Sequence, residues 1–255
     1  MSVERLSIEV TNQCSKHCNF CYNNSRSTGE TMWTPDELVT LVSDCVESGT
    51  QAVSFGGGEP LEYPGLFEVL ERLEGLVFRS ITSNGLLLRG RCLDDLVAAR
   101  PDKVHLSIHF PDKVAEVDRV ILQVQALAKL GIRSGINLLV DRSNLTAAIQ
   151  AAQKIREAGI GNDRIVYLPM RKSNTPTPQD ILRVANGQPF QSMSCLTNCH
   201  RSPRFCSISW DKKVAWCSYT VARRPLSSLT ARGLNKALQN LPLIFCKNSP
   251  EATQA

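Results

Sequence analysis

The sequence lacks any long apolar run. No stretch approaches the roughly 20 apolar residues that a membrane-spanning helix needs. The first ten residues are too polar and too short for a secretory signal peptide. Internal repeats and low-complexity tracts are absent as well. We therefore expect neither a membrane nor a secreted protein, and predict a cytoplasmic location.

The charge is not concentrated in a long run of one sign. The formal net charge of the 255 residues is +5, and it appears spread along the chain. Such a distribution gives little support for nucleic-acid binding and weak support for an acidic protein partner. We expect a small acidic reductant of the flavodoxin or ferredoxin kind, and no nucleic-acid or membrane partner.

Cysteine is abundant and clustered. Ten cysteines in a reducing compartment favour metal binding over disulfides. Three lie within residues 14–21 and four within residues 195–217, whereas Cys45, Cys92 and Cys246 stand alone. Cys45 and Cys92 are expected to be small core residues.

Strand-like and helix-like segments alternate over the first two thirds of the chain. This alternation predicts an α/β fold with parallel strands, arranged as a partial (β/α)6 barrel. Thr34, Pro35 and Glu37 form a capping box that starts the first helix, which should end near Gly49. The strands are expected at 6–10, 52–55, 78–82, 104–110, 134–140 and 165–168, and the later helices near 65–73, 93–99, 115–130 and 145–158.

The alternation stops after residue 169, which divides the chain. Residues 1–171 are predicted to form the core. Pro176, Pro178, Gly187 and Pro189 mark a linker over 172–192. Residues 193–255 are predicted to form a small, irregular, cysteine-rich extension.

The first cysteine cluster directly follows the first predicted strand. Cys14, Cys18 and Cys21 place three thiols in one short loop. Three thiolates on a four-iron cluster leave one iron without a protein ligand, which opens a site for a small molecule. The alternative is a structural zinc site with His17 as the fourth ligand.

The glycine-rich stretch Gly57-Gly58-Glu59-Pro60 follows the second predicted strand. With the three cysteines, it makes residues 5–171 resemble the radical S-adenosylmethionine (SAM) superfamily. The resemblance implies that Phe20 lies beside the adenine, and that the segment from Gly57 to Pro60 holds the methionine ammonium group. The alternative for the glycines is an ordinary turn that opens a helix.

Later polar residues match positions at which the family reaches cofactor or substrate. The resemblance implies that Asn84 and Ser107 contact the cofactor, and Asn137 and Met170 occupy further positions of this kind. His109 and Arg171 are candidate catalytic residues. The family often has an acidic residue at the position of His109, so this departure suggests that His109 faces the substrate. Each of these has the alternative of a packing or turn residue. The resemblance further implies a [4Fe–4S] cluster that binds SAM and cleaves it to a 5′-deoxyadenosyl radical, which abstracts a hydrogen atom.

The second cysteine cluster indicates another metal centre. The segment 205–217 is expected to form two strands joined by a turn at Asp211-Lys212, similar to the auxiliary-cluster hairpins of SPASM and twitch extensions. The turn lacks the usual glycine, and zinc is the alternative metal. The expected ligands of an auxiliary iron–sulfur cluster are Cys195, Cys199, Cys206 and Cys217, with Cys246 as a substitute.

The substrate is open at this stage, because one fold and one radical serve many reactions. Auxiliary-cluster extensions are frequent among peptide maturases, so we favour an enzyme that crosslinks, epimerises or excises part of a ribosomally made peptide. A separate small protein is then expected to bind the leader of that peptide. The alternatives are a radical dehydrogenase of a sugar or amino alcohol, and a non-catalytic metal-binding scaffold.

Overall fold

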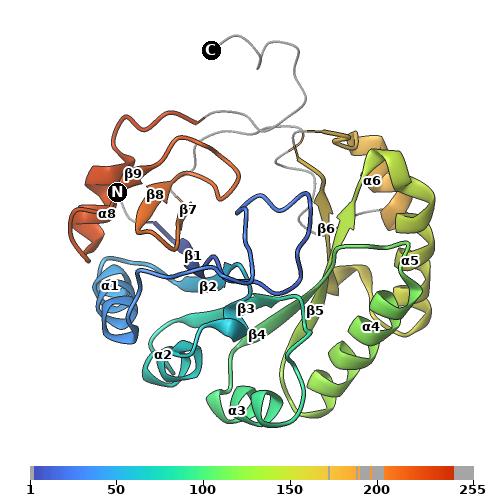
Figure 1. Cartoon of the computed structure of the whole chain (residues 1–255), viewed down its shortest axis with the longest axis horizontal. Coiled ribbons are helices and arrows are strands. Elements are labelled where there is room, and N and C mark those ends of the chain that lie inside the picture. Colours follow the sequence, from blue (N-terminus) through green and yellow to red (C-terminus); the bar gives the residue numbers. More distant parts are fainter. Residues whose placement is uncertain (1–2, 172, 188, 190–195, 197–203, 244–255) are drawn as a thin grey trace. The chain divides into compact units, whose positions relative to one another are not determined.

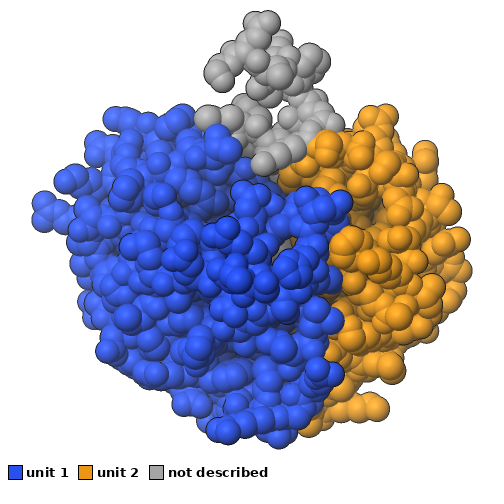
Figure 2. Space-filling view, viewed as in Figure 1, with its two compact units in different colours: residues 1–104, 201–244 blue, residues 105–200, 245–255 orange. Residues whose placement is uncertain are grey.

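A computed structural model describes residues 3–171, 173–187, 189, 196 and 204–243. The chain forms two compact units, which Figure 2 shows in different colours: unit 1 comprises residues 1–104 and 201–244, and unit 2 comprises residues 105–200 and 245–255. The chain passes from one unit to the other within strand β4 (Lys103–Ile108). Cys195, Cys199 and Cys246 lie outside the described residues.

Unit 1 contains a sheet in the order β3-β2-β1-β7-β8-β9. The pairs β1/β2, β2/β3 and β1/β7 are parallel, and β7/β8 and β8/β9 are antiparallel. Its elements are β1 (Arg5–Thr11), α1 (Pro35–Glu47), β2 (Ala52–Gly57), the 3-10 helix η1 (Pro60–Glu62), α2 (Leu66–Arg72), β3 (Phe78–Ser83), α3 (Arg91–Ala99), β7 (Phe205–Ile208), β8 (Lys213–Ala215), β9 (Arg224–Pro225) and α8 (Ala231–Leu238).

Unit 2 continues the alternation of strands and helices. Strands β5 and β6 pair in parallel, as expected of strands joined by a crossover helix. The elements that follow β4 are α4 (Val114–Lys129), β5 (Ser134–Val140), the 3-10 helix η2 (Arg142–Asn144), α5 (Leu145–Glu157), the 3-10 helix η3 (Asn162–Arg164), β6 (Ile165–Pro169) and α6 (Pro178–Ala185). The six predicted strands of the core are thus all present.

Strand β1 shows how alternation along the sequence produces a core face and a site face. Leu6, Ile8 and Val10 are buried on one face, because successive side chains of a strand point to opposite sides. Glu9 and Thr11 belong to the other face, and both are buried too. Burial on both faces is typical of strands in a parallel sheet that helices cover.

Helix α1 starts as the sequence predicts. The Thr34 hydroxyl accepts a hydrogen bond from the Glu37 amide, and the Glu37 carboxylate accepts one from the Thr34 amide. Gly49 ends this segment with a φ of 105°, a left-handed conformation that glycine adopts without strain.

The C-terminal hairpin extends the sheet of unit 1. Strand β7 pairs in parallel with β1, in a register that sets Cys206 beside Leu6 and Ile208 beside Ile8. Figure 1 shows β7, β8 and β9 following β1 at this edge. The predicted turn at Asp211-Lys212 is confirmed, with Lys212 at a φ of 59°. Residues 204–243 of the extension therefore belong to unit 1.

The expected linker contains a helix that the sequence analysis missed. Helix α6 begins after Thr177, whose hydroxyl accepts from the Asp180 amide while the Asp180 carboxylate accepts from the Thr177 amide. The sequence analysis interpreted Pro178 as a loop signal, but Pro178 occupies the first helical position of α6. None of the helices in the described ranges is long and apolar enough to cross a membrane.

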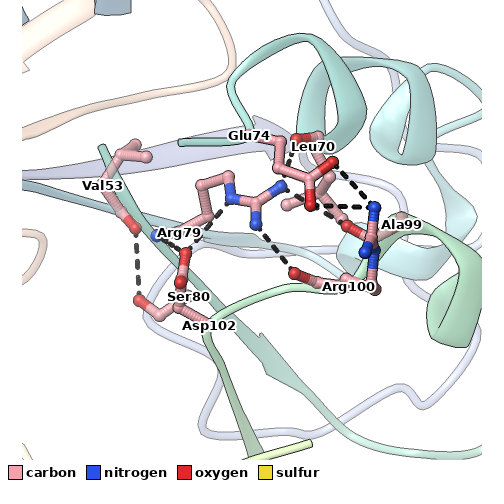
Figure 3. Close-up of polar contacts among 8 residues, drawn as sticks. All are labelled: Val53, Leu70, Glu74, Arg79, Ser80, Ala99, Arg100 and Asp102. Atoms are coloured by element: carbon pink, nitrogen blue, oxygen red, sulfur yellow. Dashed lines mark hydrogen bonds and ion pairs between the residues drawn. The ribbon is translucent and has the colours of Figure 1, made fainter. Parts of the chain in front are cut away.

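A buried arginine holds the helices of unit 1 against strand β3. The Arg79 guanidinium donates hydrogen bonds to the carbonyl oxygens of Leu70 (2.6 Å), Ala99 (3.4 Å) and Arg100 (2.8 Å). It also lies 3.1 Å from the Asp102 carboxylate, as Figure 3 shows. Because these partners lie in α2 and at the end of α3, Arg79 fixes both helices to the strand that leads into Ser83 and Asn84.

Candidate active site

The loop that follows β1 carries Cys14, Cys18 and Cys21, all half-buried. Backbone hydrogen bonds shape it: the Cys14 amide donates to the Arg26 carbonyl (2.9 Å), and the Cys21 amide donates to the Cys18 carbonyl (3.1 Å). His17 has a φ of 53°, which turns the chain between the first two cysteines. The sequence therefore presents three thiols on one structured loop.

Three thiols on one loop suit a four-iron cluster. In the described part of the chain, no group of three or more His, Cys, Asp or Glu side chains is placed to hold one metal ion. In a four-iron cluster each cysteine binds a different iron, so the three sulfur atoms need not converge on one point. Cys14, Cys18 and Cys21 would hold such a cluster, which supplies the electron for reductive cleavage of its bound cofactor.

The glycine motif packs its backbone directly against the cluster loop. A Cβ atom on Gly58 would lie 2.1 Å from the Gln13 carbonyl oxygen, and one on Gly57 would lie 2.5 Å from the Thr11 carbonyl oxygen. The Gly58 amide donates to that Thr11 oxygen (2.7 Å). Gly57 also has a φ of +113°. Only glycine permits this close approach, which explains the motif by a physical requirement rather than as a generic turn.

Glu59 is a buried carboxylate fixed by three donors. Its Oε1 accepts from the Ser83 hydroxyl (2.7 Å) and the Leu61 amide (3.1 Å), and its Oε2 accepts from the Asn84 amide (2.7 Å). Burial raises the pKa of Glu59 to about 7, although the three donors lower it. Pro60 follows at the start of η1. The motif thus presents a rigid carboxylate whose charge a bound cation would stabilise.

Asn84 joins the end of β3 to the cluster loop. Its side-chain amide lies 3.7 Å from the Cys14 sulfur, within the range of a weak hydrogen bond to sulfur. Its Oδ1 accepts from the Leu86 amide, as in a turn. Unit 1 therefore brings the cysteines, the glycine motif and Asn84 together. Phe20 is half-buried on the same loop.

Unit 2 carries the remaining predicted site residues. Ser107 on β4, Asn137 on β5 and Met170 after β6 are all buried. The Asn137 Oδ1 lies 2.9 Å from the His105 Nδ1, so part of its hydrogen-bonding capacity is used within the unit. Arg171 is half-buried directly after Met170.

The sequence analysis placed His109 within the fourth strand, but His109 lies just past the end of that strand. Strand β4 ends at Ile108. The amides of His109 and Phe110 donate to Glu116 Oε1 at 2.6 and 3.3 Å. The local reason is that Glu116, in the first turn of α4, accepts these two donors. A side chain just past a strand end is well placed for a catalytic role, which stays a prediction.

Two cysteines of the second cluster are described, and their environments differ. Cys206 is fully buried in β7, where burial and the nearby Cys45 raise its pKa well above the ordinary value. Burial also raises the pKa of Cys45 to about 12. Both cysteines lie in the core of unit 1. Cys217 is half-buried in the segment after β8.

Sequence reasoning did not single out Glu9, a buried carboxylate on the site face of β1. It is 1% exposed, and Arg223 Nη2 lies 3.5 Å from its Oε1. Burial raises the pKa of Glu9 to about 7, against the opposing effect of Arg223. The Glu9 oxygens, Ser207 Oγ and Arg223 Nη1 find no hydrogen-bond partner within the described residues. A carboxylate at the middle of a strand that was predicted to lie inside a parallel sheet was the signal that could have revealed it.

The family model of the radical SAM superfamily matches residues 8–175. That range contains the cysteine loop, the glycine motif and Asn84, as well as the end of β1 and all of β2 to β6. The chain therefore belongs to the radical SAM superfamily. Membership makes it an enzyme of the class that cleaves SAM, and it implies a [4Fe–4S] cluster and SAM as cofactors.

Curated relatives resemble part of the chain. A "Probable GTP 3',8-cyclase" of Sulfurisphaera tokodaii is 25% identical over 178 residues, which is 66% of this chain and 56% of that protein. A "GTP 3',8-cyclase" of Streptomyces coelicolor is 36% identical over 110 residues, which is 40% of this chain and 32% of that protein. The chain thus spans at most a little over half of these two relatives.

Solved structures resemble a larger part of the chain. Streptococcus suis SuiB bound to precursor peptide SuiA has a TM-score of 0.70 at 15% identity, over 91% of this chain and 64% of that one. Native anSMEcpe with bound AdoMet and Cp18Cys peptide has a TM-score of 0.66 at 15% identity, over 98% of this chain and 85% of that one. At these identities the likeness shows the fold alone. It confirms the predicted α/β class with parallel strands in a partial (β/α)6 arrangement.

Proposed function

We propose that this enzyme uses the 5′-deoxyadenosyl radical to modify a ribosomally made peptide. The observation that carries the proposal is the extent of the structural likeness. Two solved structures of similar fold, whose titles name a bound peptide, resemble 91% and 98% of this chain.

The charges of unit 1 also favour a peptide over a nucleoside triphosphate. Glu9 and Glu59 are buried carboxylates on or after neighbouring strands, and Arg223, the cation that lies beside Glu9, is already paired with it. A triphosphate would bring several further negative charges, which need more cations in a poorly solvated site than Arg171, the one arginine among the proposed site residues. A neutral peptide segment has no such requirement.

The site assignments form part of the proposal. The residues proposed to contact SAM are Phe20, Gly57, Gly58, Glu59, Pro60, Asn84, Ser107, Asn137 and Met170. His109 and Arg171 would face the substrate. For an auxiliary cluster we favour Cys195, Cys199, Cys217 and the substitute Cys246, because Cys206 lies in the core beside Cys45. A separate small leader-binding protein and an acidic reductant complete the proposal.

The test is anaerobic reconstitution with SAM and reductant, followed by mass spectrometry of candidate precursor peptides encoded beside the gene. A defined mass change that requires SAM and is absent from the C14A/C18A/C21A variant would support the proposal. The mass would also distinguish crosslinking or epimerisation from excision of backbone atoms. Withholding the leader-binding protein tests whether it is needed.

A second candidate, cyclisation of GTP, is favoured by the printed names of the curated relatives. A parallel reaction therefore contains GTP in place of peptide. SAM-dependent conversion of GTP to a cyclised product, with no peptide modified, would replace the first proposal by the second. Turnover of a sugar or amino alcohol alone would instead favour the dehydrogenase alternative.

A further inference from the structure

The positive charge of this protein is concentrated in the C-terminal extension, contrary to the expectation of an even spread. Residues 204–243 contain seven Lys and Arg against one acidic residue, a local formal charge of +6, whereas the whole chain carries +5. The rest of the sequence is therefore close to neutral. Unit 1 thus has a strongly basic C-terminal part.

Four of these seven cations are neutralised by carboxylates. Arg204 pairs with Glu4, Lys212 with Glu37, Lys213 with Asp211, and Arg223 with Glu9. These pairs attach the extension to the core or stabilise the hairpin turn, so they are part of the fold.

The other three cations, Arg224, Arg232 and Lys236, have no carboxylate partner among the described residues. They line two adjoining grooves formed by β9, α8 and the residues around them. Arg232 and Lys236 are four residues apart on α8, which places both on one face of the helix, and both are exposed. Figure 1 shows α8 beside β8 and β9.

Backbone carbonyl groups fix the position of the Arg224 guanidinium in the groove that it lines. Arg224 donates hydrogen bonds to the carbonyl oxygens of Lys236 (3.3 Å) and Gln239 (2.8 Å), near the end of α8. No acidic side chain lines either groove. Trp216 lines one of them, and Cys217, a proposed ligand of the auxiliary cluster, follows it directly. We call the surface formed by Arg224, Arg232, Lys236 and Trp216 the basic groove.

We propose that the basic groove docks the acidic one-electron carrier protein that reduces this enzyme. Each SAM that is cleaved to methionine and a 5′-deoxyadenosyl radical takes up one electron, which must come from outside the chain. A flavodoxin hydroquinone supplies it on oxidation to the semiquinone. Complementary charge accelerates such encounters and selects the partner. The proposal depends on the family chemistry alone, so it can fail or succeed independently of the peptide substrate.

The test compares two reductants on the reconstituted holoenzyme, with 5′-deoxyadenosine formation as the readout. Flavodoxin must dock, whereas dithionite is a small ion that needs no docking surface. The R232E/K236E variant should lower kcat/KM for flavodoxin by about tenfold or more, while the dithionite rate stays unchanged. The flavodoxin rate of the wild type should fall as salt is raised, and that of the variant should respond much less.

The matched control is K129E/R133E, which alters the net charge by the same amount at exposed positions of unit 2. It should behave as the wild type with both reductants. Equal flavodoxin kinetics in the groove variant and the control would overturn the proposal. So would a loss confined to substrate turnover, which would assign the groove to an acidic peptide or its carrier.

If the charge reversal in R232E/K236E also slows the dithionite reaction, the neutral variant R232Q/K236Q tests the proposal instead. It removes the attraction without adding repulsion or burying charge. A selective loss with flavodoxin, together with weaker binding of oxidised flavodoxin in calorimetry, supports the docking site. Unchanged flavodoxin binding and kinetics in this variant overturn it.

Discussion

Replacing Arg79 by methionine should destabilise unit 1 far more than any exposed Arg-to-Met change. The Arg79 side chain is 4% exposed, and its removal leaves the Leu70 and Arg100 carbonyls without their donor. Breaking a buried, hydrogen-bonded ion pair costs about 3–5 kcal/mol. Asp102 is 38% exposed and can recover water, so we expect about 3 kcal/mol.

The matched control is Arg100→Met, in the same network of Figure 3. The Arg100 and Glu74 side chains are 72% and 44% exposed, so their ion pair should contribute at most about 1 kcal/mol. The carbonyl of residue 100 still accepts from Arg79 in this control, because the backbone is unchanged.

Thermal unfolding of the holoenzyme measures the difference. For a chain of this size, about 3 kcal/mol corresponds to a fall in Tm of about 10 °C. Hydrogen exchange should also quicken in β3, since Arg79 fixes that strand to α2 and α3. Equal Tm values for the two variants would refute the reasoning, because burial would then not determine the contribution of these pairs.

Three further predictions concern the site and the cysteines. Gly58→Ala should reduce the iron bound on reconstitution, because its Cβ would meet a backbone carbonyl of the cluster loop, whereas Gly56→Ala, with nothing within 4 Å, should keep the wild-type content. The raised pKa of Glu9 means that the folded state holds a proton that the unfolded state releases. The stabilisation it gives is fully present below about pH 4.5 and is lost as the pH rises through about 7. This loss amounts to about 3 kcal/mol, so unfolding free energies measured at about pH 5 and about pH 8 should differ by less in Glu9→Gln than in the wild type. Cys206→Ala should retain the iron of the auxiliary cluster while Cys217→Ala loses about four irons, and the opposite pattern would return Cys206 to the ligand set.

Local signals along the sequence predicted the strands of unit 1 well, and the cysteine loop, the glycine motif and Asn84 lie together in the structure. The capping box at Thr34 and the approach of Gly58 to the cluster loop depend on neighbouring residues or on fixed backbone geometry. Such features can be inferred from residue type and spacing. The same holds for the hairpin turn at Lys212.

Features that depend on contacts distant in sequence were not predictable. The pairing of Glu9 with Arg223 and the burial of Cys206 beside Cys45 join segments far apart in the chain. The end of β4 before His109 depends on Glu116, whose role as an acceptor only the helix geometry reveals. Helix α6 was missed for another reason: Pro178 signals both a loop and a helix start.

The pairing of β1 with β7 has a consequence for how the protein forms during synthesis. The ribosome releases β1 at the beginning of translation, yet one of its two neighbours in the sheet arrives only when residue 205 has been made. Until then that side of β1 presents unpaired amides and carbonyls, which are prone to pair with other chains. Such distant pairings also form slowly. A chain interrupted before the hairpin should therefore tend to aggregate, even though it contains every residue of the radical-generating site in unit 1.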